Sequence, residues 1–154
     1  MKRIMSVLFI AILFASCSSD DDSSSENSIV GVWTLTEANL ELPQDFNNDG
    51  TVDSNFKNEV PCFESTTAFT ADGTYTQSFS NVEAVELNGE TTYVCNGSTN
   101  TSGTYVLDGN QLTTTTSGST PEVTTTTIDL SGNTLKATLP FGIYGDVEFV
   151  YTRN

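Results

Sequence analysis

The stretch "TLKATLPFGIYGDVEFVYTRN", residues 134–154, indicates the fold class of the whole chain. Apolar side chains occupy every second position on both sides of a glycine-containing turn: Leu135, Ala137, Leu139 and Phe141, then Val147, Phe149 and Tyr151. A period of two places alternate side chains on opposite faces of a β-strand. The stretch therefore predicts an antiparallel hairpin with one buried face and one face in water.

The same signals continue back along the chain to Ile29. Runs rich in β-branched and aromatic residues alternate with pairs that tolerate the positive φ of a two-residue hairpin. These pairs are Asp72-Gly73, Asn88-Gly89, Gly109-Asn110, Gly132-Asn133 and Tyr144-Gly145. Eight or nine strands with short turns predict an all-β, antiparallel up-and-down meander, and closure into a β-barrel would remove its open edges. A β-sandwich is the alternative, but it needs long crossovers that this chain mostly lacks.

Five runs of residues are expected to form strands upstream of the hairpin at residues 134–154. The run "SIVGVWTLTEANL", residues 28–40, places Ile29, Trp33 and Leu35 on one face. The runs "TTYVC" at 91–95 and "GTYVLD" at 103–108 are expected to be separate strands. The threonine runs at 113–116 and 124–127, with Pro121 between them, allow a glycosylated stalk as an alternative. Strands are favoured, because threonine suits a half-buried pleated surface and the second run leads into apolar Ile128.

Residues 1–16 have the layout of a secretory signal peptide. Lys2 and Arg3 precede an apolar stretch at 4–15, and small residues precede Cys17. The alternative is an uncleaved membrane anchor, but the stretch is well short of the ~20 residues that a spanning helix needs. We therefore expect export and cleavage.

The tetrapeptide "FASC", residues 14–17, resembles the lipobox of bacterial lipoproteins. The resemblance implies that Cys17 becomes the lipidated first residue, anchored by acyl chains at ~0.8 kcal/mol per buried methylene. Residues 17–28 cannot bury apolar surface and are expected to form a disordered acidic tether. The acids Asp20, Asp21 and Asp22 resemble the export signal of Bacteroidota-type lipoproteins, which implies a lipid-anchored protein of the outer membrane, displayed at the cell surface. The alternative is a solvated spacer without an address.

Charge and cysteine content narrow the possible partners and the covalent structure. The chain has a formal net charge of −15, and removal of residues 1–16 leaves only Lys57, Lys136 and Arg153 as cations against 20 acids. Such a surface repels nucleic acid, so no nucleic-acid partner is expected.

With Cys17 lipidated, Cys62 and Cys95 form an even pair in an oxidising compartment, and we expect a disulfide between them. Two free buried thiols are the alternative.

Two short motifs lie at opposite ends of residues 29–154: "GVW" at 31–33 and "VYTRN" at 150–154. Together they resemble lipocalins and the lipocalin-like domains of bacterial lipoproteins. The resemblance implies a lipocalin-like β-barrel of about eight strands over residues 29–154, with Trp33 plugging the closed end. It also implies that Arg153 lies across Trp33, a cation–π contact worth roughly 0.5 to 2 kcal/mol. The barrel mouth would hold a small apolar or amphipathic ligand.

The acidic stretch "DFNNDGTVD", residues 45–53, has the spacing of a calcium loop. Alternate positions turn inward in such loops, and glycine permits the bend. The expected oxygen ligands of a structural Ca²⁺ are the side chains of Asp45, Asn47, Asp49 and Asp53 and the carbonyl of Thr51. The spacing resembles the loops of dockerins and thrombospondin type 3 repeats. The alternative is a polar turn whose side chains cap their own backbone.

Catalysis is not expected. The chain has no histidine, which excludes Ser-His and Cys-His nucleophiles and the usual zinc sites. Glu83, Glu86 and Glu90 could supply a carboxylate pair for glycoside hydrolysis, but solvated edge charges are the favoured interpretation. Two non-enzymatic functions remain: a binding module for a small ligand, or a structural lipoprotein whose filled barrel contacts a partner protein or glycan. The interior volume of the barrel distinguishes them.

Overall fold

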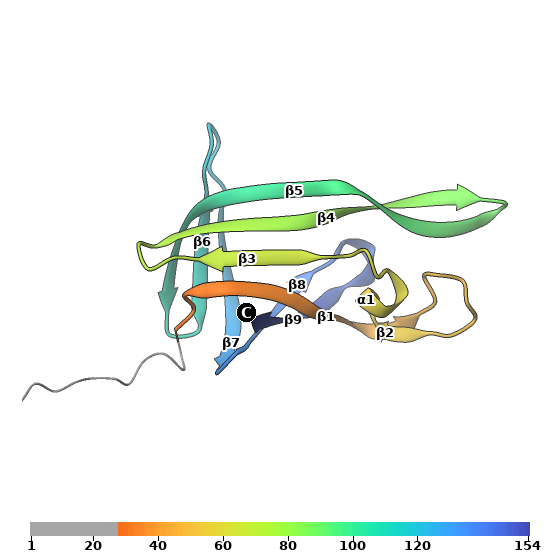
Figure 1. Cartoon of the computed structure of the whole chain (residues 1–154), viewed down its shortest axis with the longest axis horizontal. Helices are drawn as coiled ribbons and strands as arrows, with labels where there is room; N and C mark the ends of the chain where they lie inside the picture. The colour runs from red at the N-terminus through yellow and green to blue at the C-terminus, as the bar shows by residue number, and fades with distance from the viewer. Residues whose placement is uncertain (1–27) are drawn as a thin grey trace, which may run out of the picture.

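The strands pair in chain order and the sheet closes on itself (Figure 1). The computed structural model describes residues 28–154, so the predictions on the signal peptide, Cys17 and nearly all of the tether lie outside the described residues. The described chain contains nine strands and two short helical turns. Their bounds are β1 Gly31–Gln44, β2 Asp53–Asn55, α1 Phe56–Glu59, β3 Ser65–Phe69, β4 Thr74–Leu87, β5 Glu90–Asp108, β6 Gln111–Thr116, β7 Val123–Ser131, β8 Thr134–Pro140, η1 Gly142–Tyr144 and β9 Asp146–Arg153.

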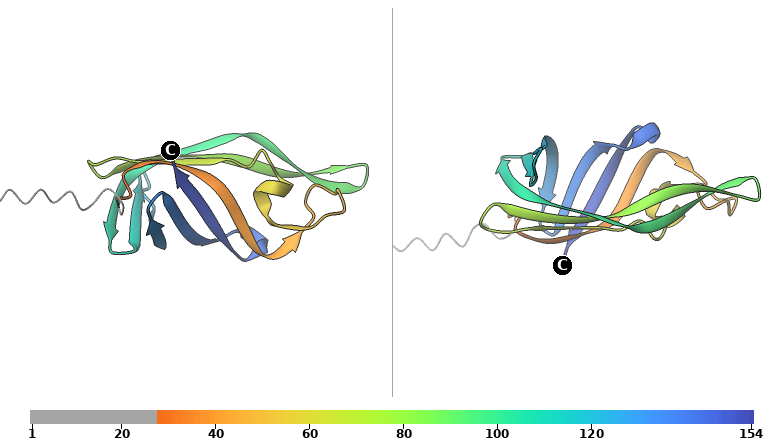
Figure 2. Two further views of the ribbon diagram at one scale, coloured as in Figure 1. Left: turned by 60° about the horizontal axis from the view of Figure 1, so that its bottom comes forward. Right: turned by 90° about the horizontal axis from the view of Figure 1, so that it is seen from above.

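Closure occurs between the first and last long strands. β1 pairs with β9 from Trp33↔Arg153 to Leu40↔Val147, and Figure 2 shows these two strands side by side. On its other edge β1 pairs first with β3 and then with β2. The result is a closed barrel of eight antiparallel strands with β2 outside it. The barrel prediction is confirmed, and the sandwich alternative is wrong.

A bulge in β1 reverses its buried face. The pairing with β9 shifts register between Leu35 and Glu37. Before the shift Trp33 and Leu35 are buried, and after it Ala38 and Leu40 are buried. An extra residue in one strand has this effect, because side chains alternate with a period of two. The predicted inward face of Trp33 and Leu35 is therefore correct, but simple alternation would not have buried Ala38.

The hairpin of β4 and β5 is longer than the sequence indicates. The runs 91–95 and 103–108, predicted to be separate strands, belong to the single 19-residue strand β5. The separation was wrong because the polar residues between them stay paired with β4, for example Ser80↔Ser98. Gly97 has φ 75° beside the register shift in this pairing. Figure 1 shows the outer part of the hairpin extending past the barrel, beyond α1.

The threonine runs form β6 and β7, as predicted. Within residues 28–154, no helix is long and apolar enough to cross a membrane. The core is continuous from Trp33 at one end of the barrel to Phe63 at the other, and both side chains are fully buried.

Candidate ligand-binding site

A cavity of about 280 Å³ lies inside the barrel. Its apolar side is formed mainly by β1, β3, β8 and β9, with Trp33, Phe69, Leu135, Ala137, Leu139 and Tyr151. Its polar side is formed by β5, β6 and β7, and we call it the threonine wall: Thr101, Thr114, Thr116, Thr124 and Thr126. Among the described residues, no Asp, Glu, Lys or Arg lines the cavity. The cavity is therefore amphipathic without being charged.

Alternation along β6 and β7 separates two classes of threonine. On the outer face the hydroxyl of Thr113 is hydrogen-bonded to that of Thr125 at 2.9 Å, and the hydroxyl of Thr127 accepts from the Gln111 amide at 2.8 Å. On the inner face Thr116 accepts a hydrogen bond from the backbone N–H of Glu122 at 2.8 Å. The hydroxyls of the other four residues of the threonine wall make no hydrogen bond to a protein group within the described chain; these residues are Thr101, Thr114, Thr124 and Thr126. Four of the five residues of the threonine wall thus line the cavity with hydroxyls that no described protein group occupies.

The strands β7 and β8 separate beside this wall. They pair with each other only over residues 128–131 and 134–137. Residues 123–127 of β7 pair with β6 instead, and residues 138–140 of β8 pair with β9. An outer groove of about 860 Å³ lies over this gap. The groove and the cavity share five lining residues, Thr124, Thr126, Ile128, Ala137 and Leu139, so the cavity lies directly behind the groove.

Trp33 and Arg153 close one end of the barrel. The guanidinium carbon of Arg153 lies 4.6 Å from the centroid of the Trp33 ring. The indole Nε1–H donates to the carbonyl of Ile29 at 2.7 Å, and the guanidinium donates to the carbonyl of Ser28. Gly31 has φ 143°, and a Cβ there would lie 3.4 Å from the side chain of Arg153. The glycine of the "GVW" motif therefore has a local reason in its positive φ, which other residues rarely adopt, while a Cβ there would only reach van der Waals contact with the arginine.

The other end is filled by aromatic rings, which we call the aromatic cap: Phe46, Phe56, Phe63, Tyr93, Phe141 and Tyr144. Phe46 makes edge-on contacts with Phe56, Tyr93 and Tyr144 at centroid distances of 5.0, 5.1 and 5.2 Å. The hydroxyls of Tyr93 and Tyr144 are 2.7 Å apart. Burial, together with this hydrogen bond, raises the pKa of Tyr144 to about 12. None of the aromatic-cap residues lines the cavity, which lies in the half of the barrel that contains Trp33.

The profile of the family described as "Lipocalin-like domain" matches residues 29–137. The chain belongs to this lipocalin-like domain family. Among solved structures, it is similar to the Echinococcus granulosus fatty-acid-binding protein 1, at 14% identity and a TM-score of 0.36, over 81% of this chain and 96% of that one. No curated protein sequence matches it.

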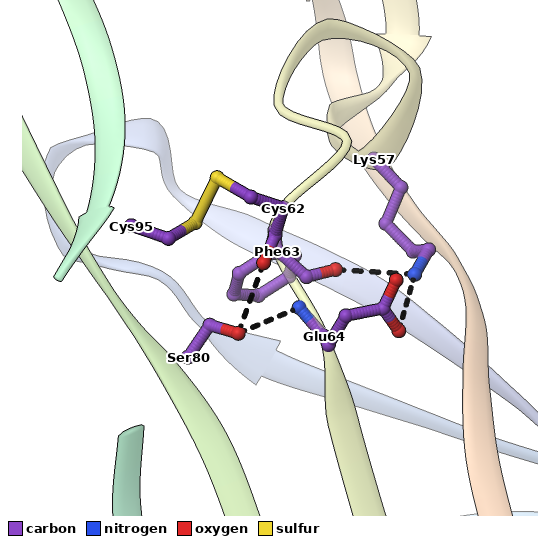
Figure 3. Close-up of a disulfide and its surroundings, with 6 residues drawn as sticks. All are labelled: Lys57, Cys62, Phe63, Glu64, Ser80 and Cys95. Carbon is purple, nitrogen blue, oxygen red and sulfur yellow. Dashed lines mark hydrogen bonds and ion pairs between the residues drawn. A yellow bond between two sulfur atoms is a disulfide. The ribbon is translucent and has the colours of Figure 1, made fainter. Parts of the chain in front are cut away.

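A disulfide joins the aromatic cap of this lipocalin-like domain to its long hairpin. Cys62 and Cys95 are bonded, as predicted, with their Cα atoms 5.9 Å apart. Figure 3 shows the surrounding contacts. The Ser80 hydroxyl donates to the Cys62 carbonyl at 3.0 Å and accepts from the Glu64 N–H at 3.0 Å. Lys57 contacts the Phe63 carbonyl and the Glu64 carboxylate, each at 3.1 Å. The connection from β2 to β3 is thereby fixed against β4 and β5.

Four of the predicted calcium residues, Asp45, Asn47, Asp49 and Thr51, lie in the loop between β1 and β2, and Asp53 is the first residue of β2. The side-chain oxygens of the Asp and Asn residues accept hydrogen bonds from the loop, from β2 and from α1. Both oxygens of Asp45 accept backbone N–H groups, from Asp49 at 3.2 Å and Gly50 at 2.9 Å. Asp49 accepts from Thr51 N–H at 2.8 Å, and this bond, together with one from the Asn47 side chain, lowers the pKa of Asp49. The side chain of Asn47 in turn accepts from the Asp49 N–H at 2.9 Å.

Asp53 binds its neighbours in the same way. Its oxygens accept from the Asn55 N–H at 2.7 Å and the Asn58 amide at 2.8 Å, and these bonds lower the pKa of Asp53. Within the part of the chain that the structure describes, no three His, Cys, Asp or Glu side chains are grouped to hold a metal ion. The geometry is that of the self-capping turn, and calcium binding stays a prediction from the spacing.

One important residue was missed by the sequence analysis. Glu59 in α1 is buried, and its carboxylate accepts the backbone N–H groups of Phe46 and Asn47 at 3.1 and 3.4 Å. It thereby holds the acidic loop and Phe46 against the barrel end. Nothing in the sequence separates this glutamate from Glu83, Glu86 and Glu90, all three of which are exposed on the β4–β5 hairpin.

Proposed function

We propose that the lipocalin-like domain is a non-catalytic binding module that holds one small, largely apolar ligand in its cavity. The observation that carries the proposal is the 280 Å³ space between an apolar side and the threonine wall. Ligand sites are typically concave, mostly apolar clefts of about 300–1,000 Å³ with a few polar groups. The cavity is at the lower edge of this range, which fits a single slender ligand.

The gap between β7 and β8 provides the route to the cavity. Both ends of the barrel are filled, by Trp33 with Arg153 at one end and by the aromatic cap at the other. The outer groove and the cavity share lining residues around the point where the β7–β8 pairing ends, at Ile128 and Ala137. A ligand would therefore enter from the side of the barrel.

We propose further that the module is a lipoprotein held at the cell surface of the outer membrane. The support is the sequence of residues 1–28: the layout of a signal peptide in residues 1–16, the resemblance of residues 14–17 to a lipobox, and an acidic composition typical of a tether. Its membrane contact would be made by the lipid on Cys17. The strongly acidic composition supports the absence of a nucleic-acid partner.

The second candidate is a structural lipoprotein that contacts a partner protein or glycan. The observation in its favour is that the aromatic cap fills one half of the barrel. Leu42, Val52 and Leu87 are also 69%, 61% and 63% exposed, at the end of β1, in the acidic loop and at the hairpin tip. Single exposed apolar residues are common, so the cavity remains the stronger observation.

Binding of the neutral fluorescent probe N-phenyl-1-naphthylamine would test the first candidate. Ala137→Phe places a ring inside the cavity and should abolish probe fluorescence. Ala84→Phe is the matched control, because Ala84 is exposed on β4 outside the barrel. Melting curves would show that Ala137→Phe still folds, since overpacking costs about 1–3 kcal/mol. If Ala137→Phe binds the probe as the native protein does, the cavity is not the site.

A further inference from the structure

We infer that the ligand of the cavity is electrically neutral and carries a hydroxyl or carbonyl group that contacts the threonine wall. The inference rests on the proposed function and specifies its ligand class. It follows from the charges that surround the cavity, from the free hydroxyl groups in its wall and from the position of these groups beside the gap.

The first observation is the absence of a counter-ion. None of the described Lys or Arg side chains lines the cavity. Lys57 and Lys136 are paired with Glu64 and Glu148 at 3.1 and 3.5 Å, and Arg153 lies over Trp33 and donates to Ser28. Burial of a carboxylate without a partner is strongly unfavourable, and proteins usually meet this need with Arg or Lys. A fatty-acid anion would find no such partner here.

A cationic ligand is disfavoured in the same way. Among the described residues, no carboxylate lines the cavity. Asp129 and Glu148 line the outer groove, but neither lines the cavity. An ammonium group inside the barrel would therefore be desolvated without a charged partner. The lining selects against both signs of charge.

The second observation is that threonines lining the cavity have hydroxyls without a hydrogen bond to a described protein group. Thr114 and Thr124 are opposite each other in the β6–β7 register, and Thr126, two residues further along β7, is opposite Leu112. Each hydroxyl can donate one hydrogen bond and accept two, and these three make none to a described protein group. A purely hydrocarbon ligand would displace their water and leave them unpaired, which is costly. A ligand hydroxyl or carbonyl would satisfy them.

The third observation orients the ligand. Thr124 and Thr126 line both the cavity and the outer groove, whereas Trp33 and Tyr151 line the cavity alone. The polar group of the ligand would thus lie at the gap between β7 and β8. Its apolar chain would extend toward Trp33. The arrangement suits neutral amphiphiles such as medium-chain alcohols, amides and esters.

Competition among ligands that share one chain tests the inference. 1-Decanol, decanoate and decylammonium would each be titrated against bound N-phenyl-1-naphthylamine at neutral pH. We expect decanol to displace the probe at a concentration at least about tenfold lower than either ion, because burial of an unpaired charge is unfavourable. If decanoate binds as tightly as decanol, the inference is overturned while the proposed function stands. If neither the probe nor decanol binds, the proposed function itself is overturned.

Two variants distinguish the threonine wall from general apolarity. Thr114→Val should weaken decanol binding about three- to tenfold, the effect of one lost hydrogen bond. Thr115→Val is the matched control, because its side chain is next along β6 and is not part of the cavity lining. Thr114→Lys should reverse the preference in favour of decanoate. Equal decanol affinity of the native protein and Thr114→Val would contradict the role of the wall.

Discussion

The guanidinium carbon of Arg153 lies 4.6 Å from the centroid of the Trp33 ring, and the two residues are register partners in the pairing of β9 with β1. The contact therefore crosses the seam at which the barrel closes. It also reaches the entering chain, because Arg153 donates to the carbonyl of Ser28. One side chain thus joins the last strand, the first strand and the segment that precedes it.

Replacement of Arg153 by methionine should destabilise this seam. Methionine retains an apolar stem but loses the cation–π contact and the charged hydrogen bond, so we expect the free energy of unfolding to fall by about 2–4 kcal/mol. Urea denaturation would measure the change. Lys136→Met is the control, since its pair with Glu148 is half-exposed at 3.5 Å and such pairs contribute about 0–1 kcal/mol. Equal losses in the two variants would contradict a special role for Arg153.

The disulfide should stabilise the cap end of the barrel and leave the cavity unaffected. Replacement of both Cys62 and Cys95 by alanine should lower the free energy of unfolding by about 2–4 kcal/mol, because the unfolded chain is no longer cross-linked. Probe binding should persist, since neither cysteine lines the cavity. Thiol labelling of denatured, unreduced protein should find neither of these two cysteines free. A labelled Cys62 would contradict the bond.

The barrel could be predicted because its signals are local. Alternation at Leu135 and Val147 and the turn pairs between strands are each readable within a few residues. The closing pair, Trp33 and Arg153, followed from a family resemblance and not from distance along the chain. The disulfide followed from counting, because only two cysteines remain after Cys17.

The candidate site could not be predicted in the same way, because it depends on register. The gap exists because β7 changes partners at residue 128, and no local signal at Ile128 marks this change. The bulge beside Leu35 and the continuity of β5 through Ser98 are also decided by the paired strand. The burial of Glu59 depends on where the acidic loop folds back, 13 residues away at Phe46. Such features require tertiary structure.

Calcium binding separates two interpretations of the acidic loop. The oxygen spacing predicts that millimolar Ca²⁺ raises the melting temperature, an affinity range of about 10⁻⁴ to 10⁻³ M being typical of extracellular modules. The self-capping turn, in which Asp45 accepts two backbone N–H groups, predicts no change. Melting curves with Ca²⁺ and with chelator would decide. Asp49→Asn is the matched variant, and a calcium effect that it leaves intact would exclude this loop as the site.

The aromatic cap should make stability sensitive to alkaline pH. Burial and the hydrogen bond with Tyr93 raise the pKa of Tyr144 to about 12, whereas an unfolded tyrosine has a pKa of about 10. The folded protein therefore keeps this proton where the unfolded chain has lost it. The resulting stability is complete below about pH 10 and disappears as the pH rises through about 12. Melting temperatures across this range should fall less steeply for Tyr144→Phe, and identical slopes would refute the assignment.

Lipidation of Cys17 predicts where the protein is found in the cell. The resemblance of residues 14–17 to a lipobox implies that Cys17 would carry the acyl chains. Single acyl chains bind membranes only marginally, so stable anchoring would depend on the complete modification. The variant Cys17→Ala should therefore appear in the soluble fraction after cell lysis, while the native protein is recovered with membranes. Retention of Cys17→Ala in membranes would indicate an uncleaved anchor at residues 4–15 instead. Surface protease digestion of intact cells, applied to the native protein, would then test the export implied by Asp20, Asp21 and Asp22.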